Sequence, residues 1–161
     1  MEESRKSAYA EGLGKDTDVS GFSAETILDF WEIQKQDIRT YSPLPLAFIG
    51  DAVYETIVRT LVVGKGNTSP GKLHTKSASI EKAAAQTKVL SAIESELSEE
   101  EAEIVRRGRN SKPHTMAKNA SVSDYLSATG LEALIGYLYL QGRNERILQL
   151  IKLGLDRTEL L

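Results

Sequence analysis

The chain has 161 residues, of which 40% are hydrophobic and 27% charged, and it contains no cysteine. This composition is typical of one soluble globular domain, and it excludes disulfides, thiolate metal sites and cysteine nucleophiles. The formal net charge of −3 does not by itself indicate a nucleic-acid-binding protein. No apolar run approaches the roughly 18 residues of a transmembrane helix, and the polar N-terminus is unlike a signal peptide. We therefore expect a cytoplasmic protein.

The N-terminal part of the sequence predicts a flexible tail followed by helices. Residues 1–20 are polar and lack hydrophobic periodicity, so we assign the single folded domain to residues 21–161. Ser23 suits the N-cap of a first helix, in which apolar residues as far as Ile38 fall near helical spacing. After a break, Pro45 suits the first turn of a long apolar helix that ends at Gly64.

The middle of the chain is rich in helix formers. Ser69 is followed by a proline and predicts the start of a helical segment. Residues 72–97 then predict one or two helices. Ser98 and Glu101 have the spacing of a capping box, which predicts a further helix that ends near Gly108.

The C-terminal part continues the helical pattern. Residues 109–121 are loop-like, and residues 122–127 predict a short helix. Residues 131–140 are strongly apolar and end at Gly142, and an amphipathic helix begins at Asn144. The sequence shows no convincing strand and no internal repeat, so we predict an all-α fold.

Three carboxylates lie where apolar residues dominate. Asp51 and Glu55 are the only acids of the long helix that ends at Gly64, and their spacing places them on one face. Glu132 is the only charged residue of residues 131–140. A buried carboxylate needs a cation, hydrogen-bond donors or water. Ordinary structural roles remain open for Asp51, as a surface acid or the partner of an arginine, and for Glu55, as the partner of Arg59.

Carboxylates on two helices can supply a magnesium site. Mg²⁺ takes oxygen ligands, often one or two carboxylates together with water and substrate phosphate. A zinc site is disfavoured, because the chain has no cysteine and only two histidines. The sequence also lacks the glycine-rich nucleotide loops and the serine nucleophile motifs.

Two segments of this acidic chain contain no acid. They are residues 56–80 and 104–123, and each carries several basic side chains. Such segments are expected where a protein binds the phosphate backbone of a nucleic acid, although solvated surface is an equally good explanation of a basic loop. The candidate RNA-binding residues are Lys72, His74, Lys76, Arg106, Arg107, Arg109, Asn110, Lys112 and Lys118. Carboxylates beside basic loops indicate metal-assisted phosphodiester hydrolysis.

Two motifs resemble those of the ribonuclease III family. The run Phe48–Glu55, FIGDAVYE, resembles the signature of the family's endonuclease domain, and GLEALIGYLYL at Gly130–Leu140 resembles its second acidic motif. The run RGRNSK at Arg107–Lys112 resembles a loop of Mini-III, the small bacterial variant without a double-stranded-RNA-binding domain. The resemblance covers roughly Leu44–Asp156.

The resemblance implies a ribonuclease III-like helical fold and a Mg²⁺-dependent endoribonuclease. Asp51 and Glu132 would be the catalytic, metal-binding acids, and Gly50 would permit a close approach beside the site. The implied substrate is double-stranded RNA, in particular the 23S ribosomal RNA precursor, with a ribosomal-protein helper as a candidate partner. Two positions that are acidic in the full-length enzymes are Ala47 and Thr129 here. Only part of the family's acidic set is therefore present.

The sequence leaves two alternatives to an enzyme. One is a catalytically silent RNA-binding dimer, favoured by the two missing acids, and the other is a helical scaffold protein. Because one chain carries one copy of each acidic motif, cutting both strands of a duplex requires two chains, and we predict a homodimer. Its candidate interface residues, some of which would instead fill the monomer core, are Phe48, Val53, Ile57, Leu131, Ile135 and Tyr139.

Overall fold

The computed structural model describes residues 21–111 and 121–161, so the predicted tail at residues 1–20 lies outside the described residues. The chain divides into two units, residues 1–35 and 36–161. Every regular element in the described residues is a helix, which confirms the predicted all-α class. Among these residues, no helix is both long and apolar enough to cross a membrane.

The first unit contains the helix α2 (Ala24–Phe30). As predicted, Ser23 is its N-cap, and the hydroxyl oxygen accepts a hydrogen bond of 3.2 Å from the backbone N–H of Thr26. The expectation of helical spacing as far as Ile38 is wrong. Glu32 has a left-handed backbone with φ of 57°, which ends the helix, and Ile38 begins a separate 3-10 helix, η1 (Ile38–Thr40).

The first α-helix of the second unit is α3 (Pro43–Gly64), and Pro45 lies in its first turn as predicted. Pro43 occupies the first turn, where its missing N–H is no loss. One face of α3 is buried, and its members recur mostly every four residues: Leu46, Ala47, Gly50, Tyr54, Val58 and Val62. This stripe is the face that packs on the rest of the unit.

The basic and alanine-rich middle segment forms two helices, α4 (Pro70–Glu81) and α5 (Ala83–Ile93). Lys82 separates them, because its extended backbone with ψ of 152° interrupts the helical path. Ser69 caps α4 as predicted, since its hydroxyl oxygen accepts from the N–H of Lys72. A short 3-10 helix, η2 (Glu94–Glu96), follows α5.

The last three helices are α6 (Glu99–Arg109), α7 (Val122–Leu140) and α8 (Asn144–Thr158). The predicted capping box is present at the start of α6, with Ser98 and Glu101 bonded reciprocally. Two boundaries differ from prediction. The helix α6 continues past Gly108, and α7 is one continuous helix rather than two.

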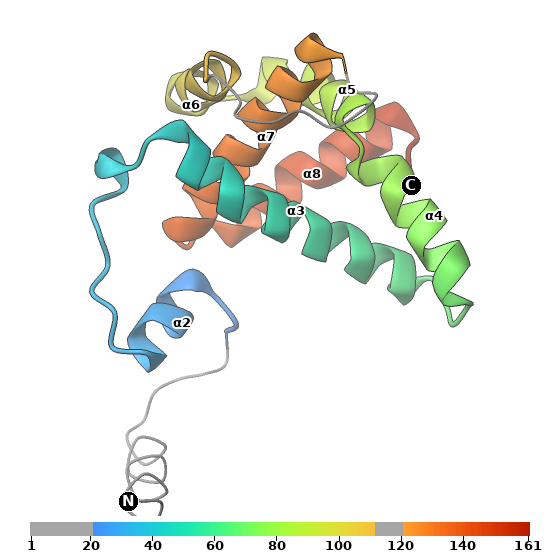
Figure 1. Ribbon diagram of the computed structural model, residues 1–161, viewed down its shortest axis with the longest axis horizontal. Coiled ribbons are helices and arrows are strands. Elements are labelled where there is room, and N and C mark those ends of the chain that lie inside the picture. The colour runs from blue at the N-terminus through green and yellow to red at the C-terminus, as the bar shows by residue number, and fades with distance from the viewer. Residues whose placement is uncertain (1–20, 112–120) are drawn as a thin grey trace, which may run out of the picture. The chain divides into compact units, whose positions relative to one another are not determined.

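The helix α7 is the centre of the second unit. The helices α3, α5, α6 and α8 all pack against it, and Figure 1 shows α3 crossing it. Two glycine crossings let helices approach α7 closely. At one of them, a Cβ atom on Gly108 would lie 2.8 Å from the Cα of Gly130. This contact explains why both glycines sit inside helices despite their low helix propensity.

Candidate active site and nucleic-acid interface

The second glycine crossing joins α3 to α7 beside the two predicted acids. A Cβ atom on Gly50 would lie 1.7 Å from the backbone oxygen of Glu132, and one on Gly136 would lie 1.9 Å from that of Leu46. Neither position therefore accepts a side chain unless the helices separate. This confirms the close approach predicted for Gly50. Because Asp51 follows Gly50 directly, the same contact brings its carboxylate toward Glu132.

The electrostatics of the two carboxylates show that they are neighbours. Asp51 is exposed and Glu132 is half-buried. Burial, and to a smaller extent the negative charge of Asp51, raises the pKa of Glu132 to about 7, against a smaller lowering by the hydrogen bond from Gln86. Partial burial also raises the pKa of Asp51, with a contribution from Glu55. A carboxylate whose ionised form is disfavoured by a second carboxylate nearby makes a favourable place for a cation.

Glu81 adds a further acid that the sequence did not single out. It is the last residue of α4, and its pKa is raised first by burial, then by Glu55, with Asp51 also contributing. Arg59 lies between these acids, with Nη2 at 2.7 Å from Glu55 Oε1 and Nε at 3.9 Å from Glu81 Oε1. The predicted pair of Glu55 with Arg59 is thus present. No sequence spacing links Glu81 to α3, because their proximity arises only from packing.

Gln86 is the second residue of the site that sequence reasoning missed. Its side chain, on α5, is only 3% exposed. The amide Nε2 donates to Glu132 Oε1 at 3.1 Å and to the backbone oxygen of Glu81 at 2.9 Å. The sequence could have pointed to Gln86 as a polar residue on an otherwise apolar helix face. The apolar Val89 and Leu90 lie three and four residues further along the same buried face.

The carboxylates of Asp51 and Glu132 fit a Mg²⁺ ion that is held by few protein ligands. Both acids present carboxylate oxygens, which are the ligands that this hard cation prefers. Among the described residues, no group of three or more His, Cys, Asp or Glu side chains is placed to hold one metal ion. An ion at Asp51 and Glu132 would therefore take its remaining ligands from water and substrate oxygens.

The two positions where fuller members of the family are acidic lie in the interior. Ala47 and Thr129 are both buried. The hydroxyl of Thr129 donates to the backbone oxygen of Tyr125 at 3.0 Å, within its own helix. Neither residue offers a charge to the site, so the folded protein does not restore an acid at these two positions.

The predicted basic loop is partly a helix. Arg106, Arg107 and Arg109 lie in the last turn of α6, and Asn110 is its C-cap. Arg109 was expected to begin the loop but lies in α6, because the Gly108 contact with α7 keeps this turn helical. Lys112 and Lys118 lie outside the described residues.

The three arginines differ in their partners. Arg106 Nη2 lies 2.5 Å from Glu103 Oε1, and Arg109 Nη2 lies 2.5 Å from Glu94 Oε1. Arg107 forms no ion pair with any described residue. Of the three, Arg107 is therefore the one without an ion-pair partner among the described residues, although its charge also helps to lower the pKa of Glu103.

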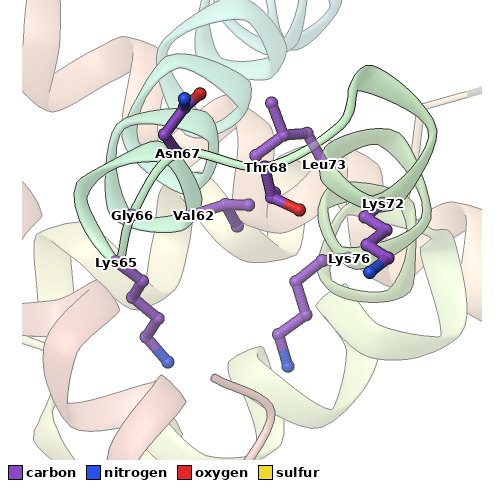
Figure 2. Close-up of a pocket in the computed structure, with 8 residues that line it drawn as sticks. All are labelled: Val62, Lys65, Gly66, Asn67, Thr68, Lys72, Leu73 and Lys76. Carbon is purple, nitrogen blue, oxygen red and sulfur yellow. The ribbon is translucent and has the colours of Figure 1, made fainter.

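The second basic group lines a pocket at the corner between α3 and α4. The residues Lys72, His74 and Lys76 are all exposed on α4. Figure 2 shows Lys72 and Lys76 together with Lys65, the C-cap of α3, around a cavity of about 320 Å³ whose lining includes no acid. Lys65 and Lys76 each donate to a backbone oxygen of the last two residues at 3.4 Å. His74 does not line this pocket.

The predicted interface residues divide into three groups by their burial. Phe48 is 83% exposed on α3, whereas Val53, Ile57 and Tyr139 are partly buried against the core. Leu131 and Ile135 are fully within the core. Their inclusion in an interface is therefore wrong, because their side chains fill the interior of the second unit itself.

Comparisons with known proteins identify the family of this chain. Residues 44–143 match the family model for the ribonuclease III domain. The chain is 46% identical over 129 residues to Mini-ribonuclease 3 of Clostridium tetani, covering 80% of this chain and 85% of that protein. It is 43% identical over 141 residues to Mini-ribonuclease 3 of Thermoanaerobacter sp., covering 88% and 96%.

A solved structure supports the fold. A crystal structure of a Fusobacterium nucleatum protein is similar with a TM-score of 0.68 and 35% identity, and the match covers 75% of this chain and 93% of that one. The chain belongs to the ribonuclease III family of endoribonucleases, in its Mini-ribonuclease 3 branch.

Proposed function

We propose that this protein hydrolyses double-stranded RNA with Mg²⁺ held by Asp51 and Glu132. The observation that carries the proposal is the carboxylate pair beside the Gly50–Gly136 crossing, where the charge of Asp51 helps raise the pKa of Glu132 to about 7. Such a pair is stabilised by a divalent cation. The proposed place of action is the cytoplasm, and the proposed natural substrate is the 23S ribosomal RNA precursor, as the family resemblance implies.

The metal ion and the two carboxylates have different roles in the proposed reaction. When bound, Mg²⁺ supplies charge neutralisation at the phosphate and lowers the pKa of a water ligand. Asp51 and Glu132 hold the ion by carboxylate oxygens, and the glycine crossing fixes the spacing of their helices. Because a ligand must be deprotonated, the proton of Glu132 competes with metal binding near neutral pH.

The basic residues bind the RNA. Arg107 on α6 and Lys72 and Lys76 on α4 are suited to phosphate, since cations near a nucleic-acid backbone contribute affinity without reading sequence. The affinity for RNA is expected to fall as the salt concentration rises. Because each chain has one carboxylate pair, we propose that a homodimer, with Phe48 in its interface, supplies the two sites that cut both strands.

Cleavage of an end-labelled RNA duplex with and without Mg²⁺ tests the proposal. The wild-type protein should cut only with the metal, and the Glu132→Gln variant should lose cutting while still shifting the duplex in a gel. The Asp156→Asn variant is a matched control, because Asp156 is an exposed acid on α8 paired with Lys152 at 2.9 Å. Undiminished cleavage by the Glu132→Gln variant would refute the site.

A catalytically silent RNA-binding protein is the second candidate. The neutral, buried Ala47 and Thr129 favour it, because they remove two acids that fuller members of the family have. It predicts duplex binding by the wild-type protein without cleavage at any Mg²⁺ concentration. The same cleavage assay therefore decides between the two functions.

A further inference from the structure

The buried amide of Gln86 lies between two helices and an acid of the site. Its Nε2 donates to Glu132 Oε1 on α7 at 3.1 Å and to the backbone oxygen of Glu81, at the end of α4, at 2.9 Å. An amide nitrogen carries two hydrogens, and these two acceptors use both. Rotating the amide by half a turn would instead place its oxygen against two other oxygens. The orientation of the Gln86 amide is therefore determined by its partners.

Core packing alone does not account for this residue. Gln86 is buried like its apolar neighbours Ala85 and Val89, and its own Oε1 has no hydrogen-bond partner among the residues that the structure describes. A buried polar atom without a partner is destabilising, so a purely structural position would favour an apolar side chain of similar size. An apolar side chain could reproduce neither the hydrogen bond to the backbone oxygen of Glu81 nor the one to Glu132, and only the second reaches an acid of the site.

We propose that Gln86 is a positioning residue that fixes the carboxylate of Glu132 for metal binding. It holds Oε1 and leaves Oε2, which accepts no hydrogen bond from any described residue, for the ion. A neutral amide suits this task. A lysine or arginine would also orient the carboxylate, but its positive charge would compete with the cation, whereas the amide leaves the charge of Glu132 intact. The inference rests on the proposed function of Glu132.

The backbone oxygen of Glu81 is the fixed end of this arrangement. Because Nε2 is anchored there, the donor cannot follow Glu132 if that side chain moves. Partners of this kind around a metal ligand commonly change metal affinity or activity by about 10–100-fold when they are removed. We expect the same range for Gln86.

The test measures metal binding directly, with two variants and one control. Gln86→Met keeps the length of the side chain without the donor, and Gln86→Asn keeps the amide but is one methylene too short to reach both acceptors. Gln141→Leu is the control, because Gln141 Nε2 donates to the backbone oxygen of Tyr137 at 2.8 Å, away from Glu132. Calorimetric titration with Mn²⁺ and no RNA gives the affinity, and thermal melting gives the stability of each protein.

The expected result is a metal affinity about 10–100-fold weaker in both Gln86 variants, with wild-type affinity in the control. The Mg²⁺ concentration for half-maximal cleavage should rise by the same factor. The KM for the duplex should stay unchanged, and excess Mg²⁺ should restore most of kcat. A merely structural role would predict lower melting temperatures without this metal-specific rescue.

Three results would overturn the inference. The first is wild-type Mn²⁺ affinity in a folded Gln86 variant, and if Gln86→Met does not fold, Gln86→Asn supplies that measurement. The second is an equal loss of affinity in the Gln141→Leu control. The third is a wild-type protein that neither binds Mn²⁺ nor cleaves RNA, and this outcome alone also refutes the proposed function.

Discussion

The carboxylate site and the basic surface are built in opposite ways. Asp51 and Glu132 are held near each other by a helix crossing in which two glycines leave no room for a side chain. The arginines of α6 and the lysines of α4 stand on helix surfaces, and several are occupied by ion pairs or single backbone contacts. The first region depends on packing geometry, so its mutations should act nearly all-or-none. The second depends on summed charge, so its mutations should act gradually.

The largest effect is expected from Gly50→Ala. Its methyl group would lie 1.7 Å from the backbone oxygen of Glu132, so α3 and α7 must separate. We expect the free energy of unfolding to fall by about 3 kcal/mol or more, with loss of cleavage. Urea unfolding measures it. Gly64→Ala is the control, because nothing lies within 4 Å of its added methyl group, and an equal loss there would contradict the packing argument.

The next effect concerns the proposed dimer. Phe48→Glu places a charge on the α3 surface where Phe48 is now exposed, and it should weaken self-association at least tenfold without unfolding the chain. Light scattering across a concentration series measures it. Leu148→Glu is the control, because Leu148 is also an exposed apolar residue, on α8. Equal behaviour of the two variants would place the interface elsewhere.

A smaller effect is expected from pH. The pKa of Glu132 is raised from 4.5 to about 7 in the folded protein, so the folded state binds more protons than the unfolded state between these values. The metal-free protein should therefore lose stability as pH rises from about 5 to 8, by about 1–3 kcal/mol. Denaturant unfolding at several pH values measures this loss. The Glu132→Gln variant should lose less stability over the same pH range. An identical pH profile of stability in both proteins would contradict the raised pKa of Glu132.

The smallest effect belongs to the basic surface. Changing Arg107 and Arg109 together to Ala should weaken binding to all duplex sequences about equally. It should also lower the slope of log affinity against log salt by up to roughly one unit for each lost phosphate contact. Filter binding over a salt series measures it. Arg157→Ala is the control, because Arg157 is a half-exposed arginine on α8 that pairs with Glu96 at 3.1 Å.

The sequence predicted those parts of the molecule that depend on local pattern. The capping box at Ser98, the cap at Ser69 and the all-α class follow from short-range chemistry, and Asp51 and Glu132 stood out as charges in apolar helices. Residues whose role arises from packing were not predicted. Gln86 contacts Glu132 across 46 positions of sequence, and no periodicity reveals such a contact.

Helix boundaries also depend partly on local sequence pattern and partly on packing. Residues 122–127 and 131–140 were expected to form separate segments, yet α7 runs continuously through Gly130, which packs against Gly108 of α6. A glycine that breaks an isolated helix is thus retained inside a packed one, and only the tertiary contact decides between the two outcomes.

The most direct test of the account is Asp51→Asn, which keeps the size of the side chain and removes the charge proposed to hold the metal. The account predicts an unchanged melting temperature, duplex affinity within about twofold of wild type, and both Mn²⁺ binding and cleavage reduced at least 100-fold. The contradicting result is a folded Asp51→Asn protein that cleaves the duplex at near wild-type rate in the same Mg²⁺ concentration.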